Sequence, residues 1–578
     1  MEPTATGNKH LLTILVEDYF HVGAFENLIQ QRNWQNFEPR YEKNTLKTLD
    51  LLDQHDTKAT FFVLGWIAER NPALIREIVL RGHEVASRGF YHRSLKNLTD
   101  EEFREDLRRT NRALEDAAGQ KVIGFRAAEK LNPEKDEWIL DVLADEGFAY
   151  DASFLPSKKT EKAKRCAHQV HTSGKAVWEF PYPTRDLGLG LLPISGGNYF
   201  RQIPYTLMRH AVRSWHEKTD APFVFYFHVW ELDPEQPRIS AASKYNRIRH
   251  YRKLDKMEWI INEHLDLYDC VGVADHLGLK SEPPTIAGGL TQNAFNPQPL
   301  KAHLQPPATA GGSDRSIPVS IVIPCYNEQE SLPYLANTLR AVGINLKENG
   351  YSLNIIFVDD QSKDETFTVL QELFGKDKNV RILQHETNMG VAAGIMTGLQ
   401  AAETDIVCSM DCDCTYDPHE LLNMLPLMKE NVDLVTASPY HRDGGVRNVP
   451  GWRLFLSRGA SFLYRRVLRS KLNTYTSCFR VYRRSSFTGM TLRESGFLGI
   501  AEMLGQLDLR GGKIVEFPSV LEVRLFGISK MKTAKTVFGH LKLLSHLTKL
   551  RWFRKSPPIE TSLAKEKLKV VSENSTEV

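Results

Sequence analysis

Two aspartates have the clearest chemical meaning in this sequence. Asp411 and Asp413 follow the apolar run Ile406-Val407-Cys408-Ser409-Met410. Residues i and i+2 of an extended segment point to the same side, so both carboxylates can face one small volume. Carboxylate oxygens suit a hard divalent cation such as Mg²⁺ or Mn²⁺, which can in turn hold a diphosphate. Two solvated acids at a strand end would give the same pattern, so the pair needs support from elsewhere in the chain.

Polar residues also follow two earlier strands. The β-rich run 318–324 ends at the turn Tyr326-Asn327-Glu328, and the apolar run 353–358 ends at Asp359-Asp360. Helical stretches separate these runs. Strands that alternate with helices and end in polar residues are typical of a doubly wound α/β sheet, whose ligand site lies along the strand ends. A nucleotide base would fit beside Tyr326 and Asp360, with a diphosphate and metal at the aspartate pair.

Seven short motifs occur in order between residues 318 and about 532. They are Val-Ile-Pro-x-Tyr-Asn-Glu (322–328), Val-Asp-Asp-x-Ser-x-Asp-x-Thr (358–366), Asn-x-Gly (388–390), Asp-x-Asp (411–413), Leu-Ser-Arg-Gly-Ala (456–460), Ser-Cys-Phe-Arg-Val-Tyr (477–482) and Gly-Ile-Ser-Lys-Met (527–531). This region resembles the family 2 glycosyltransferases of the GT-A fold, especially the dolichol-phosphate mannose synthase branch. The resemblance implies a nucleotide-sugar donor, inversion at the anomeric carbon and a divalent metal, Mg²⁺ or Mn²⁺.

The resemblance also implies roles for individual residues. Asp411 and Asp413 would hold the metal and diphosphate, and Glu502 is a candidate near the acceptor, with an exposed helix acid as the alternative. The donor-binding set that the resemblance implies is Pro324, Tyr326, Glu328 and Asp360 at the nucleoside, with Arg453, Arg524 and Lys530 at the phosphates. The chain departs from the mannose synthase branch at 437–440 and 474–476, near donor phosphate or acceptor. A lipid phosphate and a glycan therefore both stay open as acceptor.

The front part of the chain repeats the alternation of strands and helices. Apolar runs at 11–16, 58–64 and 223–227 indicate buried strands, and His228 ends the last of them. This rhythm is typical of a βα-barrel-like fold. Residues 11–275 resemble the polysaccharide deacetylases of carbohydrate esterase family 4, on motifs at 59–65, 81–87 and 228–238.

The resemblance implies a metal held by one Asp and two His, a carboxylate base and a late His acid. Arg88 stands at the first His position, and a guanidinium does not bind a cation. Leu15 stands where the base is expected, and alternation along the strand turns the remaining acid, Glu17, away from Asp18. We therefore expect a degenerate site without zinc, which serves as a glycan-binding groove or a scaffold. Its residues are Asp18, Arg88, His92, Arg126 and His228.

Composition limits the class of protein. The 578 residues include 74 Lys and Arg against 71 Asp and Glu, a balance that gives no argument for nucleic-acid binding. Seven scattered cysteines and the absence of a secretory leader at 1–12 predict reduced thiols in the cytoplasm. We expect a deacetylase-like domain (1–278), a flexible linker (279–316), a glycosyltransferase domain (317–533), a basic amphipathic helix (534–555) and a disordered tail (556–578).

The basic helix has two interpretations. Val537, Phe538, Leu541, Leu544 and Leu547 recur at three- and four-residue spacing, so the helix either packs on the catalytic domain or lies on an anionic membrane. We expect peripheral contact with the inner face of the cytoplasmic membrane. The favoured function is a metal-dependent glycosyltransferase of polysaccharide or cell-envelope biosynthesis with an inactive deacetylase-like domain. A bifunctional deacetylase–glycosyltransferase and a non-catalytic carbohydrate-binding protein are the alternatives.

Overall fold

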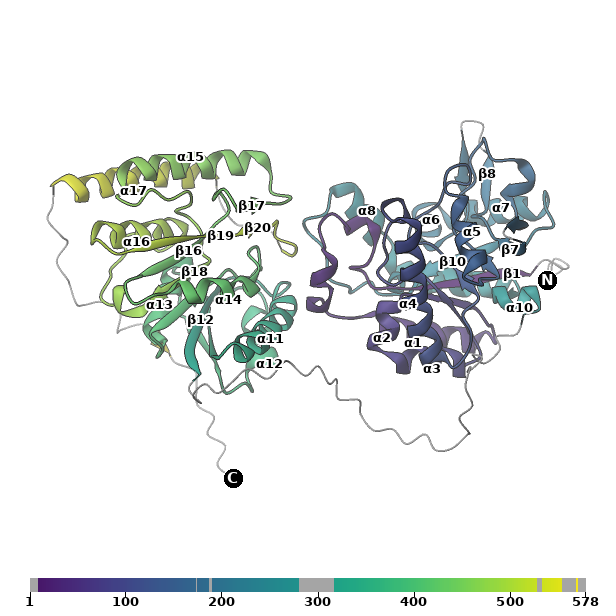
Figure 1. The fold of residues 1–578 in the computed structure, drawn as a ribbon, viewed down its shortest axis with the longest axis horizontal. Coiled ribbons are helices and arrows are strands. Elements are labelled where there is room, and N and C mark those ends of the chain that lie inside the picture. The colour runs from purple at the N-terminus through teal and green to yellow at the C-terminus, as the bar shows by residue number, and fades with distance from the viewer. Residues whose placement is uncertain are drawn as a thin grey trace, which may run out of the picture. The chain divides into compact units, whose positions relative to one another are not determined.

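The computed structural model describes residues 9–172, 174–186, 190–279, 316–527, 533–553 and 568–569. It divides into two compact units, one taken mostly from the chain before residue 305 and one mostly from the chain after it (Figure 1). Apart from residues 279, 316 and 568–569, the predicted linker and tail lie outside the described residues. No helix in the described ranges is long and apolar enough to cross a bilayer.

The first unit is built on a mainly parallel sheet with the strand order β10-β1-β2-β3-β4-β5-β7-β6, and β11 also pairs with β1. Among the described strands of this sheet, β6 and β7 are the pair that runs antiparallel. The strands are β1 (His10–Val16), β2 (Thr60–Val63), β3 (Glu84–Ser87), β4 (Gly124–Phe125), β5 (Tyr150–Asp151), β6 (His168–Thr172), β7 (Lys175–Glu179), β10 (Val224–His228) and β11 (Cys270–Val271). A separate hairpin joins β8 (Thr184–Asp186) to β9 (Leu191–Pro193).

Helices follow most of these strands. They are α1 (Tyr41–Gln54), α2 (Gly65–Arg70), α3 (Pro72–Leu80), α4 (Asp100–Ala118), α5 (Trp138–Asp145), α6 (Gly197–Gln202), α7 (Tyr205–His216), α8 (Lys244–Tyr251), α9 (Met257–Leu267) and α10 (Val273–Leu277). The longest, α4, begins at a capping box, in which Thr99 and Glu102 satisfy each other's backbone N–H groups. It ends at Gly119, whose positive φ of 67° closes the helix.

Alternate residues of the strands fill the interior of this sheet. Leu15, Phe62, Ala86, Tyr150 and Tyr226 come from five different strands and belong to one buried cluster. Within the described residues no pairing joins β6 to β10, so the barrel stays open there. The prediction of a βα-barrel-like fold is confirmed.

The second unit contains an eight-stranded mixed sheet with the order β19-β16-β18-β15-β12-β13-β14-β21. Its central strands β12 to β15 are parallel, and β18 runs antiparallel between β15 and β16. The strands are β12 (Ile317–Cys325), β13 (Tyr351–Asp359), β14 (Val380–His385), β15 (Ile406–Ser409), β16 (Leu434–Ser438), β18 (Arg480–Arg483), β19 (Ile514–Pro518) and β21 (Leu568–Lys569). A small second sheet pairs β17 (Gly445–Val446) with β20 (Val520–Leu521).

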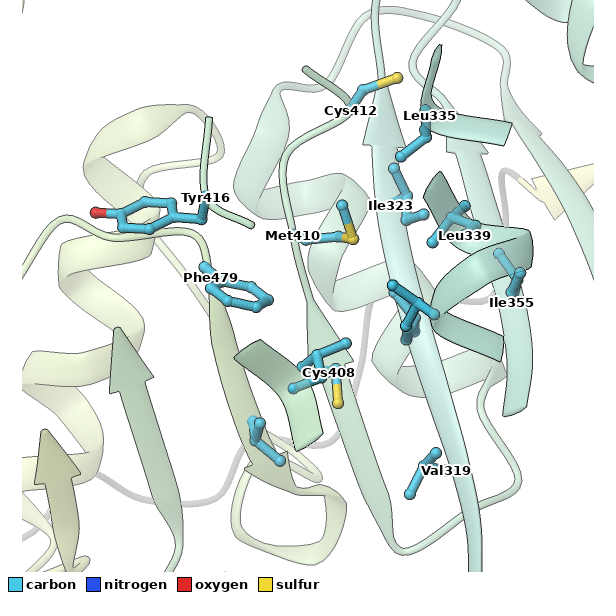
Figure 2. Close-up of a cluster of buried hydrophobic side chains, with 14 of the residues drawn as sticks. Val319, Ile323, Leu335, Leu339, Ile355, Cys408, Met410, Cys412, Tyr416 and Phe479 are labelled. Carbon is cyan, nitrogen blue, oxygen red and sulfur yellow. The ribbon is translucent and has the colours of Figure 1, made fainter. Parts of the chain in front are cut away.

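Helices cover both faces of the larger sheet. On one face, α11 and α12 contribute Leu335, Leu339 and Leu370 to a buried cluster with Val319 and Ile323 of β12, as Figure 2 shows in part. On the other face, α13, α15, α16 and α17 form a second cluster with the strands. The helices are α11 (Leu332–Glu348), α12 (Thr366–Phe374), α13 (Val391–Ala401), α14 (Leu421–Met424), α15 (Gly451–Val467), α16 (Phe497–Leu509) and α17 (Thr533–Phe553). The doubly wound fold predicted for this unit is confirmed.

Candidate functional site

The turns after β12 and β13 are tied together at the carboxyl edge of the second sheet. Asn327 has a positive φ of 51°, its backbone N–H donates to Ser362 Oγ at 2.9 Å, and its side-chain oxygen accepts from the N–H of Lys363 at 2.6 Å. Because the two strands are parallel and adjacent, their ends open on the same side of the sheet. Pro324 and Tyr326, both predicted to contact the nucleoside, lie partly exposed at this edge.

An ion-pair cluster brings together three of the predicted donor-site residues. Arg524 donates from Nε to Asp413 Oδ2 at 2.6 Å and from a terminal nitrogen to Glu328 Oε1 at 3.0 Å. A hollow of about 230 Å³ lies beside them, lined by Asn327, Glu328, Gln329, Glu330, Ser331, Asp364 and Gly527. The guanidinium therefore neutralises two carboxylates.

Asp411 lies within the same cluster of charges. Burial, and then the nearby Asp413 carboxylate, raise the pKa of Asp411 to about 7, and the Cys478 thiol donates a hydrogen bond to it. Two carboxylates that repel each other in a buried place are stabilised by a cation between them. Their oxygen-only chemistry, two residues apart after β15, fits a hard divalent metal such as Mg²⁺ or Mn²⁺.

The two aspartates at the end of β13 have different partners. Asp360 accepts hydrogen bonds from the N–H groups of Met389 and Gly390, both at 2.7 Å, and lies 2.8 Å from His385 Nδ1. Its carboxylate thus holds the 388–390 turn, and its contact with a nucleoside stays a prediction. Asp359 is fully buried, and its Oδ1 has no hydrogen-bond partner among the described residues. This oxygen makes Asp359 a further candidate for the site, one that the Asp359-Asp360 pair in the sequence could have indicated.

Glu502 is not exposed, which excludes the alternative interpretation of an exposed helix acid. It lies fully buried in α16, and its carboxylate accepts from the N–H groups of Arg493 and Glu494 at 2.9 to 3.2 Å and from the Gln506 amide at 3.1 Å. Its role near the acceptor stays a prediction. The carboxylate is already occupied by the segment that packs against the Gly390 turn, where Ala393 N–H donates to Ser495 O.

The remaining predicted phosphate ligands are less defined. Arg453 lies in the first turn of α15, and its buried Nε has no hydrogen-bond partner within the described ranges. Lys530 lies outside the described residues.

The two departures from the mannose synthase pattern lie side by side. Ser438 Oγ at the end of β16 is 2.9 Å from Thr474 Oγ1. The backbone N–H of Thr474 and both nitrogens of Asn473 bind the Glu516 carboxylate at 2.7 to 2.9 Å. The two altered segments, 437–440 and 474–476, are therefore in contact and form one continuous surface, which we call the 437–440 and 474–476 wall.

The deacetylase-like site of the first unit is centred on Glu17. Arg88 donates from Nε to Glu17 Oε2 at 2.8 Å, His92 Nε2 lies 3.0 Å from the same oxygen, and His228 Nδ1 lies 2.5 Å from Oε1. Burial works to raise the pKa of Glu17, but Arg88, His228 and His92 together hold it well below its ordinary value. Arg88 also donates to the Ala127 carbonyl at 2.9 Å. The cluster is compact, and its charges balance. Among its four side chains, His228 is the most exposed.

Asp18, the residue expected to bind the metal, does not join this cluster. Its carboxylate accepts hydrogen bonds from the N–H groups of Tyr19, Arg40 and Tyr41 at 2.6 to 2.9 Å. Burial raises the pKa of Asp18 to about 7. The predicted alternation is correct, because Glu17 and Asp18 point to different surroundings. Glu17, and not Asp18, points toward the other residues of the site.

Arg126, also predicted for this site, is buried in the interior of the first sheet. It donates to Thr13 Oγ1 at 3.1 Å, and its guanidinium carbon lies 4.2 Å from the Tyr226 ring centre and 4.7 Å from that of Tyr182. Its charge therefore meets aromatic faces, and it also interacts with the buried carboxylates of Asp151 and Glu179.

These residues do not fit a zinc ion. The Arg88 guanidinium donates to the Glu17 carboxylate at 2.8 Å and lies 3.3 Å from His92 Nε2, so a positive charge already contacts both groups that would bind a metal. Across the described part of the chain, no group of three or more His, Cys, Asp or Glu side chains is arranged to hold a metal ion.

The comparison with known protein families agrees with the folds of both units. The family model described as glycosyl transferase family 2 matches residues 320–489. A polysaccharide deacetylase model matches residues 28–148, and a domain of unknown function, DUF3473, matches residues 152–270. The chain carries a family 2 glycosyltransferase domain behind a polysaccharide deacetylase domain. Both family predictions are confirmed.

Two curated relatives are similar to part of this chain. A dolichol-phosphate mannosyltransferase of Pyrococcus furiosus is 30% identical over 233 residues, which are 40% of this chain and 64% of the relative. A polyprenol monophosphomannose synthase of Mycolicibacterium smegmatis is 28% identical over 232 residues, 39% of this chain and 84% of the relative. The chain thus spans under two thirds of the length of the first of these relatives.

Among solved structures, glucosyl-3-phosphoglycerate synthase of Mycobacterium tuberculosis, in complex with Mn²⁺, UDP and glucosyl-3-phosphoglycerate, is 18% identical at a TM-score of 0.31. The match covers 41% of this chain and 80% of that one.

Proposed function

We propose that the glycosyltransferase domain transfers a sugar from a nucleotide-sugar donor, with inversion, to a lipid-phosphate or glycan acceptor in polysaccharide or cell-envelope biosynthesis. The observation that carries the proposal is the cluster of Asp411, Asp413, Glu328 and Arg524 at the carboxyl edge of the parallel strands. Acids and one arginine in this arrangement suit a metal-bound diphosphate better than any neutral ligand.

Each group has a defined task in this proposal. Asp411 and Asp413 would hold Mg²⁺ or Mn²⁺, which supplies positive charge to the departing diphosphate. Arg524 lies within reach of the same region and would exchange a carboxylate for a phosphate oxygen, a bidentate partner of similar geometry. Asp359 offers the buried Oδ1 as an acceptor for a nucleobase N–H.

Two further acids, Asp360 and Glu502, hold backbone segments next to the site. Asp360 holds the 388–390 turn, and Glu502 holds the backbone at 493–494, just before the carbonyl of Ser495 that receives the Ala393 N–H. A Cβ on Gly390 would stand 2.7 Å from that same carbonyl, so the turn and the segment are closely packed. Both acids thus position the donor site in this proposal.

Nucleotide binding tests the proposal directly. Isothermal titration of the full-length protein with nucleoside diphosphates should show binding that requires Mg²⁺ or Mn²⁺. Asp413→Asn should weaken it by roughly a hundredfold, because a metal ligand is lost. Asp405→Asn is the matched control, since Asp405 is an exposed acid at the other end of β15 and pairs with Arg483 at 2.8 Å. Equal effects of the two substitutions would contradict the metal assignment.

We further propose that the deacetylase domain does not deacetylate and is retained as a scaffold or a glycan-binding groove. The support is the Arg88–Glu17–His92 arrangement, in which a guanidinium already contacts the carboxylate and the imidazole that would bind a catalytic metal. Metal analysis of the purified full-length protein and an acetate-release assay on acetylated oligosaccharides test this. Stoichiometric zinc at Glu17 and His92, or acetate release that Glu17→Gln abolishes, would overturn it and favour the bifunctional alternative.

A further inference from the structure

Helices α15 and α17 of the glycosyltransferase domain expose large apolar side chains. Exposed fractions lie between 40% and 78% for Trp452, Phe455, Phe462 and Leu463 on α15 and for Val537, Phe538, Leu541 and Trp552 on α17. Single exposed apolar residues are ordinary on a protein surface, but a contiguous group of aromatic side chains indicates a contact surface. We call this group the α15–α17 face.

The exposed residues form one stripe on each helix. At about 100° of rotation per residue, the four on α15 fall within an arc of about 100°, and so do the four on α17. The opposite side of α17 is occupied, since Leu543, Leu544 and Leu547 are buried in the core. The exposed stripes are therefore not needed for folding of this domain.

The two helices form one rigid surface. Tyr464 of α15 is fully buried, and its hydroxyl lies 2.9 Å from His540 Nδ1 of α17. Arg551 near the end of α17 donates to the carbonyls of Val467 and Leu468 at the end of α15. Figure 1 shows α15 and α17 side by side along one edge of the unit, in agreement with these contacts.

The charge of both helices has a single sign. The segment 451–467 contains four arginines and no Asp or Glu, and the segment 533–553 contains three lysines and one arginine, again with no acid. The whole chain, by contrast, is nearly balanced. Arg458, Arg465, Arg466, Lys542 and Lys549 are exposed beside the apolar stripes.

We infer that the α15–α17 face docks on an anionic lipid surface. Aromatic side chains prefer the headgroup level of a bilayer, and flanking Lys and Arg are attracted by anionic lipids. The apolar face of α17 predicted from the sequence is only half of this surface. The other half is α15, whose exposed aromatics come from a different part of the chain.

The docked orientation connects the surface to the donor site, a step that rests on the proposed function. The guanidinium carbon of Arg458 on α15 lies 5.2 Å from the centre of the Tyr440 ring. Tyr440 follows β16, two residues after the Ser438 that contacts Thr474. A lipid-phosphate acceptor would therefore approach the altered 437–440 and 474–476 wall from the docked side.

Vesicle flotation of the full-length protein tests the docking. Vesicles of phosphatidylcholine alone are compared with vesicles that contain about 30% phosphatidylglycerol. The protein should float with the anionic vesicles at low salt and leave them at high salt. Phe455→Ser with Phe462→Ser should lower the bound fraction by roughly tenfold or more. Arg458→Glu with Arg466→Glu should lower it at least as much, since each lost positive charge weakens partition about fivefold.

Controls separate this docking from folding and from donor chemistry. Ile344→Ser removes an apolar side chain of α11 that is 60% exposed in the same unit, and it should float like the wild type. Asp413→Asn should also float normally, so a failure of donor binding and a failure of docking are distinguishable. The inference is overturned if the wild type stays unbound at low salt or if Ile344→Ser matches the phenylalanine variant. It is equally overturned if sedimentation shows a dimer that Phe455→Ser with Phe462→Ser dissociates, because the face would then bind a second copy.

Discussion

Replacement of Arg88 by Met should destabilise the deacetylase domain strongly, because it leaves the Glu17 carboxylate buried without its main partner. Arg88 and Glu17 are 3% and 1% exposed, and their contact is 2.8 Å. Loss of one member of a buried ion pair costs about 3–5 kcal/mol. His92 and His228 also contact Glu17, so the loss should fall near the lower end, about 3 kcal/mol.

The double variant distinguishes a structural ion pair from a functional one. Glu17→Gln alone leaves the Arg88 guanidinium without its carboxylate and should cost about as much as Arg88→Met alone. Together, the two substitutions remove both charges and should cost at least about 2 kcal/mol less than the sum of the single variants. Arg108→Met is the matched control, because Arg108 pairs with Glu146 at 2.8 Å while it is 56% exposed, and this should cost about 1 kcal/mol or less.

Hydrogen exchange as a function of urea is the appropriate assay, since a chain of two compact units is not expected to unfold in a single two-state transition. Peptides that cover β1 and β3 should show the loss, and peptides of the glycosyltransferase domain should not. A strictly additive double variant, or an Arg88→Met protein as stable as the wild type, would refute the ion-pair account. Arg88 would then be free for a ligand.

Three further outcomes are expected. Asp359→Asn should weaken nucleoside diphosphate binding about tenfold in isothermal titration without changing the melting temperature, because it replaces the buried Oδ1, which has no hydrogen-bond partner among the described residues; unchanged affinity would exclude a nucleobase contact. Glu502→Gln should lower the melting temperature and donor affinity together, since Glu502 holds the 493–494 backbone; a loss of turnover with both unchanged would instead place it at the acceptor. Burial, and then His216, lower the pKa of His264 to about 3, so protons bind the unfolded chain first and stability falls from about pH 6.5 toward that value. His264→Gln should make this acid-side slope shallower by about one proton in urea unfolding of the deacetylase domain, and an unchanged slope would contradict the assignment.

The sequence predicted the helices and strands of the glycosyltransferase domain well, because hydrophobic periodicity and turn residues are local signals. The run that ends at Asp411 became β15, and the expected helix near 331–348 became α11. The same signals do not tell which of two adjacent acids receives a backbone N–H. Asp360 meets the 388–390 turn only because β14 and α13 bring that turn across the edge of the sheet.

The burial of individual acidic side chains is the other property that a local sequence pattern cannot predict. Alternation along β1 separated Glu17 from Asp18 correctly, but the side that faces Arg88 depends on how five strands close around Leu15. Nothing in the sequence around Glu502 indicates that its side chain is completely buried. For α17, burial of Leu544 and Leu547 agrees with the packed interpretation, whereas Phe538 is exposed, and contact with a membrane stays a proposal.

The most direct test of the central claim is turnover by the full-length protein across a panel of nucleotide sugars, with release of nucleoside diphosphate as the readout. The account predicts release that needs Mg²⁺ or Mn²⁺, stops with chelator, and falls about a hundredfold or more in Asp413→Asn. Glu17→Gln with Arg88→Met should leave the rate within about twofold, since transfer resides in the other domain. Turnover that is independent of metal, or that survives in Asp413→Asn, would contradict the assignment of the chemistry to the Asp411–Asp413 site.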